Sequence, residues 1–424
     1  MRLLVVLLLS ALCATAEVKT LTLRQALDLA LAQNPDLLLA RLDQQKARSQ
    51  VTVTHDPFTP KIYAGSGAAY TYGFPSTIEG SAPSIVQVKT QMAIFNRPLS
   101  YQVAQSKEAA RGSAIDVTRR EDEVIYRVTS LYLDAEQAAR SLDAAGKQAA
   151  SLLRVRELMD QRVREGRELA VESKKANLAA LRANQHVEAL SLDLLNAEGS
   201  LALALGLGPE DRVRAATEQR APLAVGESEE ASIEAALASS KELKTLESNM
   251  QAKFLEIKGY QAERLPKINL VAQYSLFAKY AYQAYFTQFQ RNNAQLGMSI
   301  EVPLILGQSG AALVSQSQTD IAKLRIEVTR TRARIANDLR AAYQDVRRAE
   351  MARDVARADL DVAREELTLD LAQMDEGRMP LASVEAARAT EDEKWLAYYE
   401  SQHTAELARL NVLRQTGTLE ALMH

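Results

Sequence analysis

The residue types that carry most protein chemistry are spread through this chain without a catalytic or metal-binding arrangement. Its four histidines lack the spacing of metal ligands; they are His55, His186, His403 and His424. The glycines form no phosphate-binding loop, and the many acids lie in helical segments, where charged residues usually face solvent. We therefore expect a protein that is not an enzyme and that uses no cofactor or metal.

A short motif of charged residues around a glycine occurs twice. Glu165-Gly166-Arg167 recurs 211 positions later as Glu376-Gly377-Arg378. Each copy interrupts a long segment with a helical pattern, and glycine permits the positive φ that a tight turn after a helix requires. The motif therefore predicts two turns, each at the end of a helical hairpin.

Most of the chain has the pattern of long helices. Residues 99–163 and 311–374 predict helices of about 97 and about 96 Å. Shorter helices are expected over 23–53, 170–205, 232–264 and 381–414, the first with Thr22 as N-cap and a kink at Asn34-Pro35. Residues 211–229 are expected to form an irregular connector. Each long helix matches two short ones placed end to end, which predicts a helical tube roughly 100 Å deep.

Four segments instead alternate apolar and polar residues, which is typical of strands with one apolar face. They cover residues 61–74, 85–95, 267–277 and about 295–302, and Pro98, Pro266 and Pro303 stand at their ends. We predict two β-hairpins, within residues 60–98 and 266–303. The aromatic interval between residues 280 and 289 is expected at a membrane interface or in an outward loop.

Four such strands cannot stand alone in lipid, because their edges would leave backbone groups unpaired. Three identical chains would supply about twelve strands, which is within the range of outer-membrane barrels. Apolar residues of the segment 321–346 recur at steps of three, four and seven, which favours coiled-coil packing within and between chains. The alternative is a pair of hairpins packed on helices in a soluble protein.

The N-terminus is typical of a secretory signal peptide. Met1-Arg2 precedes a short apolar run, and Ala14-Thr15-Ala16 has the small-residue pattern of a cleavage site. We predict a signal peptide over residues 1–16, and the bulky Leu12 disfavours lipid attachment at Cys13. No later segment has about 18 uninterrupted apolar residues, and the net charge of −3 gives no reason to expect nucleic-acid binding.

The two halves of the sequence repeat each other. Pro60-Lys61-Ile62 recurs at an offset of 206, and Tyr132 and Gly206 match Tyr343 and Gly417 at an offset of 211. The first repeat is predicted over residues 17–230, with the helical hairpin at 99–206 and a connector at 207–230. The second is predicted over 231–424, with the helical hairpin at 310–414 and a C-terminal belt segment.

Several short sequence stretches, together with their order along the chain, give a family resemblance over essentially all of the mature length. The chain resembles the TolC-type outer-membrane efflux proteins. The residues that carry this likeness are Thr22 to Leu27, Asn34-Pro35-Asp36-Leu37, Leu205-Gly206-Leu207, Leu265-Pro266-Lys267-Ile268, Val302-Pro303-Leu304 and the two Glu-Gly-Arg turns. The resemblance implies a mainly α fold with a small β part: a homotrimer with a twelve-stranded outer-membrane β-barrel on a long periplasmic α-helical barrel.

The resemblance also implies a function. Such proteins are passive ducts of tripartite efflux or type I secretion systems in the outer membrane of Gram-negative bacteria, and their partners are a periplasmic adaptor, or membrane fusion, protein and an inner-membrane transporter. A soluble periplasmic coiled-coil adaptor or structural protein is the alternative. The sequence leaves open the exported substrate, the ion selectivity and the position of the gate.

The resemblance assigns roles to the two turns. Glu165, Gly166, Arg167, Glu376, Gly377 and Arg378 would dock the adaptor and frame the periplasmic entrance. Relatives often carry acids just after these turns, and some of these acids narrow the pore entrance as an acidic ring. Here the corresponding positions are Glu172 and Ser383, so the second acid of such a ring is missing or displaced to Asp375 or Glu385. A solvated helix face is the alternative interpretation of each acid.

Overall fold

The computed structural model describes residues 18–66, 84–216, 223–226, 228–277, 292–305, 307–419 and 422. The predicted signal peptide, the end of the first predicted strand and the aromatic interval 280–289 lie outside these residues. The chain divides into two compact units. One comprises Met1–Leu39, Thr118–Ser240 and Arg332–His424, and the other comprises Ala40–Val117 and Lys241–Thr331, so each unit takes segments from both halves of the sequence.

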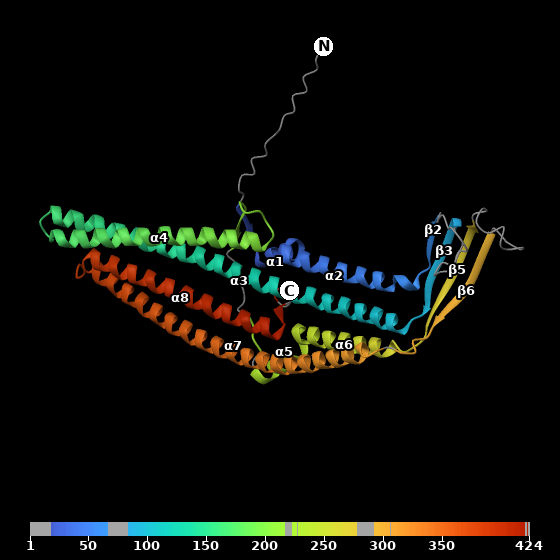
Figure 1. The fold of residues 1–424 in the computed structure, drawn as a ribbon. Helices are drawn as coiled ribbons and strands as arrows, with labels where there is room; N and C mark the ends of the chain where they lie inside the picture. The colour runs from blue at the N-terminus through green and yellow to red at the C-terminus, as the bar shows by residue number, and fades with distance from the viewer. Residues whose placement is uncertain are drawn as a thin grey trace, which may run out of the picture. The chain divides into compact units, whose positions relative to one another are not determined.

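Two long helical hairpins account for about half of the chain (Figure 1). The first consists of α3 (Arg97–Arg164) and α4 (Ala170–Ala204), and the second of α7 (Ser309–Asp375) and α8 (Leu381–Thr416). The bounds predicted from sequence are confirmed to within a few residues. α3 is continuous for 68 residues because its one proline, Pro98, occupies the first turn, where a missing N–H leaves no helical hydrogen bond unmade.

Shorter helices precede each hairpin. They are α1 (Leu23–Gln33), α2 (Pro35–His55), α5 (Glu229–Ser239) and α6 (Lys241–Ala262), with a 3-10 turn at Asp56–Phe58. Thr22 caps α1 in a capping box with Gln25, as the sequence predicted for the N-cap. The break at Asn34 is confirmed. The single helix predicted over 232–264 is wrong, because Ser240, at the position equivalent to Asn34, separates α5 from α6.

The prediction of an irregular connector over residues 211–229 is also wrong in part. β4 (Arg212–Ala215) pairs in parallel with β1 (Val18–Leu21), which adds a two-stranded sheet to the four predicted strands. Val213 is fully buried, and the hydroxyl of the buried Tyr132 lies 3.2 Å from the carbonyl oxygen of Leu21. This small sheet is therefore anchored to α3 within its own unit.

The four remaining strands form an antiparallel sheet in the order β2-β3-β5-β6, side by side in Figure 1. They are β2 (Lys61–Gly65), β3 (Ser84–Phe95), β5 (Lys267–Phe277) and β6 (Asn292–Glu301). The register aligns apolar residues with one another on one face; these are Ile62, Ala64, Val86, Val88, Met92, Leu270, Ala272, Tyr274, Leu276, Leu296, Met298 and Ile300. The predicted alternation is thus confirmed.

The apolar face of this sheet is uncovered in the single chain. Leu296 is 80% exposed, Ile62 74% and Met298 68%. A patch of this kind marks a surface that meets lipid or another protein. No described helix combines the length and the apolar character that crossing a bilayer would demand.

α4 and α8 are each followed by a glycine with positive φ, and the two glycines differ in how much space a side chain would have. Gly206 has φ +83°, and a Cβ added there would lie 2.4 Å from the carbonyl oxygen of Gln33. Asn34 fixes this junction, because its side-chain amide donates to the carbonyl of Ala204 over 2.7 Å. The equivalent Gly417 has φ +72° and would meet Ser239 Oγ at 3.2 Å. Glycine is therefore required at Gly206 for both conformation and space.

We predict that Gly206→Ala lowers the free energy of unfolding by more than about 3 kcal/mol, because it adds a backbone clash to the strain of a left-handed residue. Gly166→Ala has the same strain, at φ +70°, but no atom within 4 Å of the new Cβ, so it should cost only about 1–2 kcal/mol. Thermal unfolding of the two purified variants measures the difference. Equal midpoints would contradict the described packing at Gly206.

Candidate functional site

The first predicted turn joins α3 to α4 through a left-handed glycine. Gly166 donates its N–H to the carbonyl of Val163 over 3.0 Å, and Arg167 donates to that of Arg162 over 2.9 Å. This pair of bonds satisfies carbonyls that the end of α3 would otherwise leave unpaired, as in a Schellman motif. The turn is thereby held in one conformation by its own backbone.

The second turn repeats this geometry between α7 and α8. Gly377 has φ +72°, and its N–H donates to the carbonyl of Met374 over 2.9 Å. Arg378 donates to the carbonyl of Gln373 over 2.8 Å. Both turns lie at the same end of their unit (Figure 1). We refer to residues 165–167 and 376–378 as the hairpin tips.

The charged side chains of the hairpin tips pair with each other but stay open to solvent. Arg167 lies 3.2 Å from Glu165, and Arg378 lies 3.0 Å from Glu376; both arginines are 76% exposed. Exposed pairs of this kind add little to stability. The six predicted tip residues therefore combine a fixed backbone with accessible charges.

The three candidate acids are in different environments. Glu172 lies in the first turn of α4 and is half-buried, 2.9 Å from Lys175. Asp375 is exposed at the end of α7. Glu385 is only 4% exposed and contacts Arg154 at 3.8 Å and Arg388 at 3.2 Å. The structure therefore does not bring the three acids together within one chain.

Glu385 belongs to a polar interface between the two hairpins, which we call the α3–α8 seam. A buried carboxylate requires a nearby cation, and two arginines supply this charge. The seam includes three contacts along α3 and α8: Arg154 to Glu385, Gln148 Nε2 donating to the carbonyl of Ala389 over 3.1 Å, and His403 Nε2 at 2.9 Å from Asp134. Burial lowers the pKa of His403 and raises that of Asp134.

The α3–α8 seam was not predicted from the sequence, although the regular spacing of its charged residues is visible there. Glu385, Arg388 and Asp392 follow at steps of three and four on α8, which places them on one helical face. Lys147 and Arg154 are seven residues apart on α3. Opposite charges at matching intervals on two helices indicate a shared interface, but the sequence does not say which two helices of the four meet.

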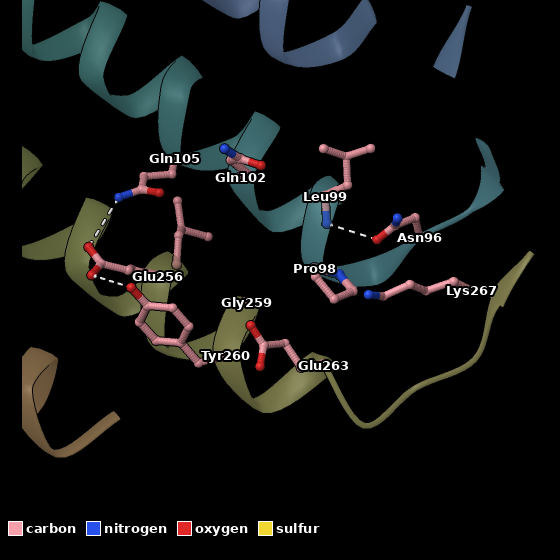
Figure 2. Close-up of a pocket in the computed structure, with 11 residues that line it drawn as sticks. Asn96, Pro98, Leu99, Gln102, Gln105, Glu256, Gly259, Tyr260, Glu263 and Lys267 are labelled. Atoms are coloured by element: carbon pink, nitrogen blue, oxygen red, sulfur yellow. Dashed lines mark hydrogen bonds between the residues drawn. The ribbon is translucent and has the colours of Figure 1, made fainter. Parts of the chain in front are cut away.

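A separate pocket of about 610 Å³ lies within the other unit, between the start of α3 and the end of α6 (Figure 2). Its central acid is Glu256, which accepts hydrogen bonds from Gln105 at 3.2 Å and Tyr260 at 3.1 Å. Lys253 also pairs with Glu256 at 3.1 Å. Burial alone would raise the pKa of Glu256, but the ammonium group of Lys253 and the hydroxyl groups of Tyr260 and Ser317 outweigh it and lower the pKa. The carboxylate is thus already occupied by protein groups.

Among the residues that the structure describes, no three His, Cys, Asp or Glu side chains lie close enough together to bind a metal ion. The features that could carry function are two exposed surfaces, namely the hairpin tips and the uncovered sheet face, and one buried interface, the α3–α8 seam.

Comparison with known proteins agrees with this arrangement. Residues 26–207 match the family model described as outer membrane efflux protein, and no curated protein sequence matches the chain. A membrane protein from Pseudomonas aeruginosa is 16% identical with a TM-score of 0.76, over 93% of each chain. The CmeC outer membrane channel of Campylobacter jejuni is 15% identical with a TM-score of 0.75, over 93% of this chain and 85% of that one.

A third solved structure, of the transmembrane channel protein CusC, is 14% identical with a TM-score of 0.74, over 93% of this chain and 92% of that one. Likenesses at these identities establish the fold. Together with the family match, they confirm the resemblance to TolC-type proteins that the sequence predicted.

The seam generates a prediction about pH. Burial, together with the charge of Glu391, raises the pKa of Asp392 from its ordinary 3.8 to about 6, although Lys147 and Arg388 oppose the shift. Between these two values, the carboxyl group of Asp392 therefore keeps its proton in the folded state but releases it in the unfolded state. This contribution to stability is fully present below 3.8 and is lost as the pH rises through about 6.

Asp392→Asn should accordingly raise the free energy of unfolding at about pH 8 by about 1 kcal/mol, after allowance for solvent screening, and leave it nearly unchanged below about pH 4. Unfolding midpoints of both proteins across this range measure the effect. Glu393→Gln, at an exposed neighbouring position, controls for loss of an acid from α8. A constant difference at every pH would refute the assignment.

Proposed function

We propose, on the premise that residues 26–207 match the outer membrane efflux protein family and the whole chain has the fold of such channels, that this protein is an outer-membrane efflux channel. It exports substrates passively, after an inner-membrane transporter and a periplasmic adaptor deliver them. Its sheet lies in the outer membrane of a Gram-negative bacterium, and its helices extend into the periplasm. The relatives are channels rather than enzymes.

The observation that carries this proposal is the sheet with one uncovered apolar face. Four strands have two edges, β2 and β6, whose backbone groups need partners. In lipid these partners must be other strands, and three copies of the sheet supply about twelve strands in a closed barrel. The apolar face then meets lipid, and the polar face lines the lumen.

Exposed apolar residues on the helices support assembly into a homotrimer. On α7, Met351, Val355, Val362 and Leu369 are each more than half exposed and follow at steps of four and seven. On α4, Leu178, Leu181, Leu192 and Leu195 are also exposed. Positions at heptad spacing pack against neighbouring helices. Helices of adjacent copies are the partners that would cover both stripes.

Single-channel recording of the full-length, detergent-purified protein tests the proposal, with the particle mass measured in parallel. We expect a trimer that inserts into planar bilayers and shows a small conductance, because the periplasmic end is closed at rest. A monomeric particle that does not insert would instead support the alternative, a soluble periplasmic coiled-coil adaptor or structural protein.

The hairpin tips are the proposed adaptor-docking and entrance surface. In support, Gly166 and Gly377 have open space around them, and Arg167 and Arg378 are exposed. Entrance roles for Glu172 and Asp375 need the other copies of the trimer, whereas Glu385 would act through the seam. Opening would separate the two hairpins of a chain along the α3–α8 seam.

Replacing both Gly166 and Gly377 with Phe should abolish adaptor crosslinking and export while the trimer still forms, because bulk at the tips obstructs docking without an internal clash. The matched control is the double Ala variant, which has the same backbone strain without the bulk. Export assays and crosslinking in cells measure the effect. Unchanged crosslinking and export with Phe at both positions would exclude docking at the tips.

A further inference from the structure

The polar face of the four-stranded sheet carries one lysine at its centre. The register aligns Tyr63 of β2, Lys89 of β3, Gln273 of β5 and Gln295 of β6 in one row across the sheet. Residues directly opposite each other in antiparallel strands point to the same face. Lys89 is exposed and therefore stands among neutral polar side chains on the face opposite to the apolar one.

The neighbouring rows contain no acid to balance this charge. One row consists of Gly65, Gln87, Ser275 and Asn293, and the other of Lys61, Gln91, Val271 and Gly297. Within the four strands as described, Glu301 is the one acid, and it lies directly opposite Lys267 at the end of the sheet. Lys61 forms a close ion pair with Asp56. Among the described residues of these rows, Lys89 therefore has no carboxylate beside it to balance its positive charge.

We propose that Lys89 forms an anion-binding ring in the lumen of the β-barrel and that the duct favours anionic cargo. This inference rests on the proposed function, because three copies are needed to close the ring. Twelve strands about 4.8 Å apart and tilted by about 40° enclose a barrel of about 12 Å radius. Three lysine side chains that extend inward bring their ammonium groups still closer to the axis.

The electrostatic range is sufficient for three charges to act on one ion. The Debye length is about 10 Å at 0.1 M salt, which is comparable with the barrel radius, but about 3 Å at 1 M. Rings of Lys or Arg give pores a preference for anions, and substitutions on the lumen face of a barrel change selectivity. The ring should therefore bind multivalent anions at low salt and lose them at high salt.

Block of single channels by inorganic tripolyphosphate tests the ring. With the full-length protein in about 0.1 M salt, we expect tripolyphosphate added on the barrel side to block the current, and the block to disappear in about 1 M salt. Lys89→Met has a similar length without the charge and should raise the half-blocking concentration at least about tenfold, as should Lys89→Gln. Lys89→Arg keeps the charge and should retain the block.

The outcomes separate this inference from the function it rests on. Wild-type channels that tripolyphosphate does not block, or K89M channels blocked as strongly as the wild type, would overturn the lysine ring while the channel function stands. Absence of any channel from the wild-type protein would overturn both. Loss of block in K89M and K89Q with retention in K89R supports the ring.

Discussion

The pairing of backbone groups at the sheet edges is the constraint on which the rest of this architecture depends. Four antiparallel strands satisfy each other internally but leave β2 and β6 with open edges. The uncovered apolar face adds a second demand, since residues such as Leu296 are 80% exposed. A closed ring of strands in lipid meets both demands at once. In the homotrimer that we propose, three copies close this ring, and the helices that continue from the strands then pack around the same axis.

The α3–α8 seam shows how the helical part can be stable and still separable. An apolar interface of this length would gain free energy from burial alone and would be costly to open. The seam instead contains ionisable groups, with Glu385 between Arg154 and Arg388 and with His403 beside Asp134. Because water solvates these groups well once they are exposed, opening the seam costs less free energy than opening an apolar interface of the same length would. Such an interface suits the opening along the seam that we propose.

Much of the fold could be predicted from local sequence, and the failures share one physical cause. Strand β5 (Lys267–Phe277) was predicted with its observed bounds, because Pro266 and a mostly regular alternation of apolar and polar residues are local signals. The glycine turns were equally clear. The β1–β4 pairing was missed because four-residue strands lack a pattern and their partners are distant in sequence. The break at Ser240 was missed because Lys241, which stands where the first repeat has Pro35, lacks the steric effect of proline. The burial of Glu385 was missed because it depends on which helices meet.

The left-handed glycines differ in how freely the chain can evolve around them. At Gly206 the backbone of Gln33 fills the space where a side chain would begin, so variation there removes the fold before selection can act on function. At Gly166 and Gly377 that space is empty. A substitution at the tips therefore adds only the strain of a left-handed residue and no backbone clash. Under the docking role proposed for the tips, a lineage could change the partner that it recognises in small, viable steps.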